Sequence, residues 1–224
     1  MSDKEIVLKE FLKLADDLSK PRGFMKVVNY VSSWFSLNVT VLIQALGLQR
    51  SITRGSSEPL ILNIGSGDQF PVECINTDLF PTFGSLFKII TGRESVKFDY
   101  FLNVVYGDRN LNGVADGIIL SHVLEHIPAK LSLTVLKNLR SFLTYDGVLR
   151  ISVPVLKAYD KNPIPLDQGI TTRSIAQNSL FYRWNHQFMY DQELLTILLE
   201  TAGFKNIHVK CSFFRLVFTK RVAP

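Results

Sequence analysis

The chain has 224 residues, of which 46% are hydrophobic and 20% are charged, so it can close one core of ordinary domain size and hardly two. Charges of both signs are spread along the sequence, which excludes a disordered chain and a long acidic or basic tail. The net charge of +5 would suit an anionic partner, but Lys and Arg do not gather with aromatic residues, so we expect no nucleic-acid partner.

The cysteines and the first residues bear on the compartment. Cys74 and Cys211 lie far apart in apolar surroundings, which is typical of reduced thiols and argues against a disulfide framework or a zinc site. The segment "MSDKEIVLKE" is charged and lacks an apolar signal core. We therefore expect a cytoplasmic protein.

An N-terminal helical arm is expected over residues 1–57. Residues 3–19 have an amphipathic helical pattern that "KPRG" ends. Residues 24–46 are apolar over a length that could cross a bilayer, but Lys26 and three amides interrupt them. A helix packed on the main domain is the favoured interpretation, and a peripheral membrane contact through 24–46 is the alternative. The polar stretch before residue 58 would join the arm to a main domain at 58–224.

From residue 58 onward, short apolar runs alternate with segments of helical length. Strands are predicted at 60–64, 74–77, 100–105, 117–121 and 148–153, and one or two more at 206–220. A helix is predicted between the fourth and fifth strands, with Pro128 in its first turn, and another from Asp191 as N-cap to Gly203. This alternation predicts an α/β fold with a doubly wound, mostly parallel sheet.

A glycine bend and a carboxylate follow the first two strands. Gly65, Ser66 and Gly67 come directly after the first apolar run, and Asp78 ends the second. In a parallel sheet these positions lie together at the ligand-binding edge, where a carboxylate can accept both hydroxyl protons of a ribose. The simpler interpretation is a turn followed by a capping Asp.

The pattern differs from that of a dinucleotide site. A third glycine is missing, Asp68 follows Gly67, and ten residues rather than about twenty separate Gly67 from Asp78. An acidic side chain beside a pyrophosphate would be repulsive. A cofactor with a nucleoside and no phosphate, such as S-adenosyl-L-methionine, fits better.

Five sequence blocks together resemble the class I S-adenosylmethionine-dependent methyltransferases, which have a Rossmann-like fold. The blocks are "LNIGSG", "INTDLFP", "ADGIILSHVLEHIP", "LRSFLTYDGVLRISVP" and "HQFMYDQELLTILLETAGF", and they span residues 58–209. They are most similar to a bacterial branch, of the methyltransferase type 11 kind, that is associated with polysaccharide and cell-surface glycan synthesis.

The resemblance implies roles for particular residues. Gly65, Ser66 and Gly67 would form the cofactor loop, Asp78 would hold the ribose, and Leu79 would line the adenine. The family's usual acid in the first motif is replaced by Asn63. The adenine contact after the third strand is left open between two residues, because spacing favours Asn103 and residue type favours Asp108. Ser121, at the end of the fourth strand, completes the expected cofactor set.

The block "SHVLEHIP" follows the fourth strand and would face the transferred methyl group. His122, Glu125 and His126 can converge if a helical turn begins there. Three interpretations remain open. Glu125 and His126 hold the turn through backbone bonds, or His122 or His126 takes a proton from an acceptor hydroxyl. The third is a divalent-metal site, because ubiquinone-pathway O-methyltransferases have a similar Glu-x-x-Glu-His block; we expect no metal.

The segment 155–190 is long, polar and aromatic, and either builds an acceptor pocket or covers the core. Its candidate pocket residues are Tyr159, Arg173, Tyr182, Arg183, Trp184 and His186. His186 matches a histidine common in the family and is, beside His122, a candidate base.

The expected function is O-methylation of a sugar, a polysaccharide precursor or another small hydroxylated acceptor. The alternatives are a catalytically silent scaffold of the same fold and an RNA or protein methyltransferase.

Overall fold

The computed structural model describes residues 24–53, 58–67, 69–93, 95, 98–154, 164–166, 169–171, 173–183, 186–212 and 215–221. The predicted helix at 3–19, Asp68, Tyr159 and Trp184 lie outside the described residues. The division at residue 58 falls beside another such gap and stays a prediction.

A seven-stranded sheet in the order β3-β2-β1-β4-β5-β9-β8 forms the centre of the described structure. Neighbouring strands from β3 to β5 are parallel, whereas β9 is antiparallel to β5 and to β8. The predicted mostly parallel sheet with flanking helices is therefore confirmed. The strands are β1 (Ile61–Ile64), β2 (Ile75–Asp78), β3 (Tyr100–Phe101), β4 (Ala115–Ser121), β5 (Leu143–Pro154), β8 (His208–Ser212) and β9 (Arg215–Arg221).

The core lies between this sheet and the helices α4 (Ser132–Phe142) and α6 (Gln192–Thr201). Val135, Leu136 and Leu139 on α4 are fully buried at helical spacing, so one face of the helix packs on the sheet. Asp191 accepts a hydrogen bond from the Leu194 amide, and Gly203 has φ +91°. Both predicted ends of α6 are thus confirmed.

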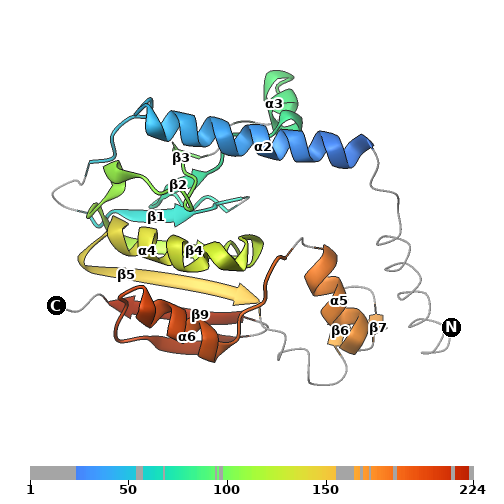
Figure 1. The fold of residues 1–224 in the computed structure, drawn as a ribbon, viewed down its shortest axis with the longest axis vertical. Coiled ribbons are helices and arrows are strands. Elements are labelled where there is room, and N and C mark those ends of the chain that lie inside the picture. The colour runs from blue at the N-terminus through green and yellow to red at the C-terminus, as the bar shows by residue number, and fades with distance from the viewer. Residues whose placement is uncertain are drawn as a thin grey trace.

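A second group of helices lies at the β3 end of the sheet. Figure 1 shows α2 (Phe24–Ala45) along that end, with α3 (Phe83–Ile90) projecting beyond it. Within the described residues, no helix combines the length and the apolar character needed to span a bilayer. A two-stranded hairpin, β6 (Ile164–Leu166) with β7 (Gly169–Thr171), and α5 (Arg173–Arg183) occupy part of the segment 155–190.

Three predicted boundaries were wrong. The third strand ends at Phe101 rather than residue 105, because Asn103 Oδ1 accepts hydrogen bonds from the amides of Val105 and Tyr106 and turns the chain. The fifth strand begins at Leu143 and pairs with Ala115 ahead of a register shift. Pro128 precedes a short 3₁₀ turn, and α4 begins only at Ser132.

Candidate functional site

The order of the parallel strands reverses between β1 and β4, which are neighbours in the sheet. Ligands of open α/β sheets bind outside the carboxyl ends of the strands at such a reversal. The segments that follow β1, β2 and β4 therefore form the candidate site.

The glycine bend after β1 has a backbone conformation that requires glycine. Gly65 and Gly67 have φ values of +64° and +53°, in the left-handed region. A Cβ on Gly65 would lie 2.6 Å from Cγ2 of Val123, which follows β4. Ser66 is buried, and its amide donates to the Thr77 carbonyl at 3.0 Å. The bend is therefore packed tightly against the end of β2 and the segment that follows β4.

Asn63 anchors this bend from inside the sheet. Its side chain is buried, and its Nδ2 donates to the Gln69 carbonyl and to Asn76 Oδ1, both at 2.9 Å. The position that holds an acid in the family thus carries an amide that closes the loop 65–69.

Asp78 connects the end of β2 to the glycine bend. Its Oδ2 accepts a hydrogen bond from the Gly67 amide at 2.9 Å, and its Oδ1 accepts one from the Leu79 amide at 2.7 Å. A carboxylate offers about four acceptor positions, so two remain for a ligand. Asp78 and Leu79 are both partly exposed and can meet one.

The two candidates for the adenine contact, Asn103 and Asp108, both have structural partners. Asn103 Oδ1 forms the turn after β3. Asp108 is buried and accepts hydrogen bonds from the Tyr100 hydroxyl at 2.7 Å and the Asn110 amide at 2.9 Å. Burial and the neighbouring Asp108 raise the pKa of Tyr100, which therefore stays neutral and donates.

A cavity of about 830 Å³ lies beside Asp108, between the C-terminal ends of α2 and α4. Gly113 and Val114, just before β4, bond to the carbonyls of Ser141 and Phe142, two of the residues that line it. The cavity thus reaches the amino end of β4, and its lining includes neither the glycine bend nor Asp78. We assign the site to the strand reversal rather than to this cavity, because the polar ligand-binding groups gather there.

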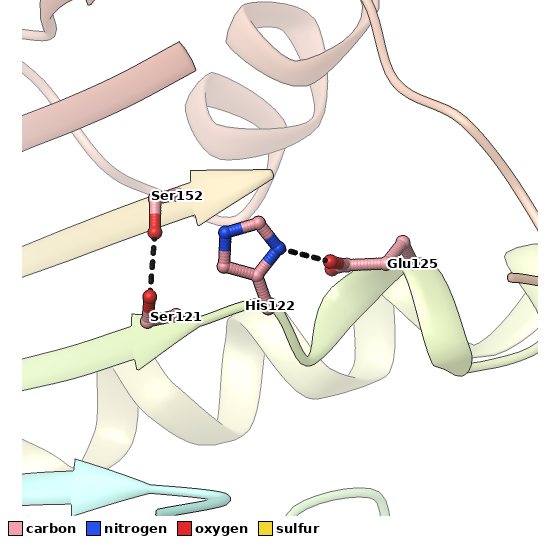
Figure 2. Close-up of polar contacts among 4 residues, drawn as sticks. All are labelled: Ser121, His122, Glu125 and Ser152. Carbon is pink, nitrogen blue, oxygen red and sulfur yellow. Dashed lines mark hydrogen bonds and ion pairs between the residues drawn. The ribbon is translucent and has the colours of Figure 1, made fainter. Parts of the chain in front are cut away.

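His122 lies at the carboxyl end of β4 in a strained conformation, with φ +56°. Figure 2 shows one ring nitrogen turned toward Glu125; His122 Nδ1 and Glu125 Oε1 are 3.0 Å apart. Among the described residues, His122 Nε2 has no hydrogen-bond partner and is shielded from solvent. The same figure shows Ser121 beside Ser152 of β5, with 2.9 Å between their hydroxyl oxygens.

Glu125 brings the three predicted histidines together. It is fully buried, and its Oε2 has no hydrogen-bond partner among the described residues. One ligand atom each from Glu125, His126 and His186 lies within 4.8 Å of the others, so the three could hold a metal ion. The rings of His126 and His186 are also 4.8 Å apart, centroid to centroid. We had expected Glu125 to hold the turn through hydrogen bonds to the backbone. This is wrong, because its side chain bonds the His122 ring.

Gln187 holds this cluster together and was missed by sequence reasoning. Its backbone N–H donates to the Glu125 carbonyl and its side-chain Nε2 donates to the His126 carbonyl, both at 2.7 Å. These bonds bring His186 next to the turn after β4. A glutamine beside the candidate base was the only signal in the sequence.

The other expected pocket residues are only partly described. Tyr182 is exposed on α5 with its ring 5.3 Å from that of Phe181. The side chains of Arg173 and Arg183, like Tyr159 and Trp184, lie outside the described residues.

Cys74 is free and buried, and burial, with the charge of Glu73, raises the pKa of its thiol.

No protein-family model and no curated protein matches this chain. Solved structures do match. A methyltransferase from Thermotoga maritima, described as a possible histamine N-methyltransferase, has a TM-score of 0.53 at 15% identity, over 89% of this chain and 97% of its own. An O-methyltransferase family protein from Burkholderia thailandensis has a TM-score of 0.52 at 14% identity, over 98% and 70%.

PigF, solved with S-adenosylhomocysteine (SAH), has a TM-score of 0.50 at 18% identity; the match covers 74% of this chain and only about half, 51%, of PigF. At these identities the likeness establishes the fold. The described chain therefore has the Rossmann-like fold of these structural neighbours, one of which is described as an S-adenosylmethionine-dependent methyltransferase and another as an O-methyltransferase family protein.

Proposed function

We propose that this protein is an S-adenosylmethionine-dependent methyltransferase that methylates a hydroxyl oxygen of a sugar, a polysaccharide precursor or another small acceptor. The observation that carries the proposal is the Asp78 carboxylate, bonded to the Gly67 amide at the strand reversal of a methyltransferase fold. Fold alone does not establish activity, so the proposal rests on this site.

The residues at the glycine bend fit this cofactor. Asp78 has two acceptor positions left for the ribose hydroxyls, and Leu79 lies next to it for the adenine. The bend of Gly65, Ser66 and Gly67 lets a ligand approach the backbone closely. When bound, S-adenosyl-L-methionine supplies an electrophilic methyl group. The neutral Asn63 holds the loop that would contact this cofactor.

The acceptor hydroxyl must lose its proton as its oxygen attacks, and our proposal assigns that proton to His122, which follows β4 at the candidate site. With Nδ1–H donating to Glu125 Oε1, Nε2 is the nitrogen without a partner among the described residues, and the acceptor would displace the groups that shield it from solvent. Glu125 then fixes the ring and stabilises the imidazolium that forms, as a carboxylate does in a histidine-based relay. His126 and His186, next to Glu125, are the other candidates for the base.

The choice of oxygen as acceptor rests on this base and on the sequence resemblance to glycan methyltransferases. The neighbours do not decide it, since one is named as an O-methyltransferase family protein and another as a possible N-methyltransferase. The glycan acceptor is thus the part of the proposal that needs a direct test.

Calorimetric titration with S-adenosylmethionine tests the cofactor, and methyl-labelled cofactor with fractionated glycan extracts tests the acceptor. We expect binding and transfer of label to a hydroxylated product. Binding without transfer to any fraction would favour a silent scaffold of this fold. An absence of binding would refute the proposed function.

A further inference from the structure

The inner face of α2 carries a polar stripe, which is the reverse of an ordinary surface helix. Ser32, Ser36, Thr40 and Gln44 are spaced four residues apart, and all are buried. Ser32 Oγ accepts from the Phe83 amide at 2.8 Å, and Thr40 Oγ1 accepts from the Phe80 amide at 2.7 Å. Ser36 Oγ donates to the Phe80 carbonyl. The side of α2 that faces the domain is thus fixed by hydrogen bonds to the main chain.

The outer face of α2 is mostly apolar, with Asn38 as an exposed polar residue on it. The exposed side chains are 41–71% accessible and include Tyr30, Val31, Trp34, Leu37 and Leu42. The sequence has no charged residue from 27 to 49. A long, aromatic and uncharged helix face exposed to water is unusual for a protein without a partner.

The helix α3 extends this apolar face. Phe83, Phe87 and Ile90 follow one another at helical spacing and are 41–81% accessible. The Phe83 ring lies 4.8 Å from the ring of Phe35 on α2, so the two helices are in contact. Figure 1 shows both at the same end of the molecule. We call the outer faces of α2 and α3 together the α2–α3 surface.

The two segments that form this surface contain more basic than acidic residues. Residues 24–53 and 79–93 contain Lys26, Arg50, Lys88 and Arg93 and no Asp or Glu, and Asp78 and Glu94 flank the second segment. Apolar and aromatic side chains with cations at their borders are typical of helices that lie in the headgroup region of a membrane.

We propose that the α2–α3 surface binds an anionic lipid bilayer, with α2 lying parallel to the bilayer plane. A crossing orientation is disfavoured, because the buried polar stripe of α2 is bonded to the domain and no described helix is long and apolar enough to span. A dimer through this surface would bring together two segments with an excess of basic residues. An anionic lipid surface meets both the apolar and the cationic groups.

Co-sedimentation of the full chain with vesicles tests this proposal without reference to catalysis. One set of vesicles contains phosphatidylcholine alone, and the other contains equal parts of phosphatidylcholine and phosphatidylglycerol. We expect binding to the mixed vesicles, weakened by salt, and little binding to the neutral ones. Equal binding to both sets, or to neither, would overturn the proposal.

Two sets of variants, each with a matched control, locate the surface. Trp34→Ser with Leu42→Ser should abolish sedimentation, whereas Ile197→Ser, an exposed apolar residue on α6, should not. Arg50→Ala and Arg93→Ala should each weaken binding about fivefold, and Lys205→Ala should not. Thermal unfolding checks that each variant folds, which is expected because these side chains are exposed.

Two outcomes would point to other occupants and would also overturn the proposal. The double serine variant could sediment like the unmodified chain. Alternatively, size-exclusion chromatography could show a dimer that the serine replacements dissociate while vesicle binding is absent.

Discussion

Replacement of Asp78 by alanine should weaken the affinity for S-adenosylmethionine by about a hundredfold. A hydrogen bond to a charged group contributes about 1.5–3 kcal/mol, and two ribose hydroxyls would bond to this carboxylate. Because Asp78 is partly exposed, the lower value applies, and two bonds give about 3 kcal/mol, or roughly a hundredfold in the dissociation constant. The loss of the Gly67 hydrogen bond would loosen the bend and add to this effect.

Calorimetric titrations of Asp78→Ala and of a matched control, Asp191→Ala, measure the effect. Asp191 also accepts a hydrogen bond from a backbone amide, that of Leu194 at 2.8 Å, but it caps α6 away from the glycine bend. Its replacement should lower the free energy of unfolding by about 1 kcal/mol and leave the affinity unchanged. An Asp78→Ala affinity within twofold of the unmodified chain would refute the ribose assignment.

Three further predictions concern the site and its support. Gly65→Ala should destabilise the fold by more than about 2 kcal/mol, because Gly65 has a φ of +64° and an added Cβ would contact Val123. Denaturant unfolding should show that Val123→Ala partly restores the stability. An unchanged stability of Gly65→Ala would contradict the geometry. Glu125→Gln should lower the methyl-transfer rate about a hundredfold without weakening cofactor binding, because Glu125 bonds the His122 ring. EDTA should not change the rate of the unmodified chain. A rate that falls with EDTA would instead indicate a metal ion at Glu125, His126 and His186. Because the pKa of Tyr100 is raised in the folded state, the free energy of unfolding should fall as pH rises above about 10, where Tyr100 of the unfolded chain ionises. Urea unfolding across this pH range should show a smaller fall for Tyr100→Phe. An equal fall in this variant would exclude Tyr100 as the cause.

The features predicted well from the sequence are those that local chemistry determines. The apolar runs became strands because each is flanked by residues that turn the chain, and α6 begins and ends at its capping residues. The glycine bend and Asp78 meet because parallel strands place their carboxyl ends at one edge of the sheet. Such features need only the strand order and no knowledge of side-chain packing.

The features that were not predicted depend on contacts between distant segments. His122 and His126 share one turn, so their proximity followed from spacing, but His186 joins them through Gln187, whose bond to His126 spans 61 residues of sequence. The third strand was predicted too long because its apolar residues continue past Asn103 into a turn. Residue type favoured Asp108 as one of two candidates for the adenine contact, but it does not reveal that the Tyr100 hydroxyl donates to its carboxylate.

The polar stripe of α2 had a signal in the sequence, the spacing of Ser32, Ser36, Thr40 and Gln44. In the sequence these residues only interrupt a hydrophobic segment. The structure shows that they lie on the face of α2 that is hydrogen-bonded to the domain.

The partners of that stripe, and of the nearby Gln49, are main-chain groups rather than side chains. Gln44 bonds the Asn103 amide and the Gly107 carbonyl, and Gln49 bonds both backbone groups of Phe101. A backbone amide or carbonyl is present whatever residue occupies its position, provided that no proline removes the amide. Substitutions that leave the backbone path unchanged therefore preserve these hydrogen bonds, so the attachment of the helix tolerates side-chain changes in the segments that it contacts.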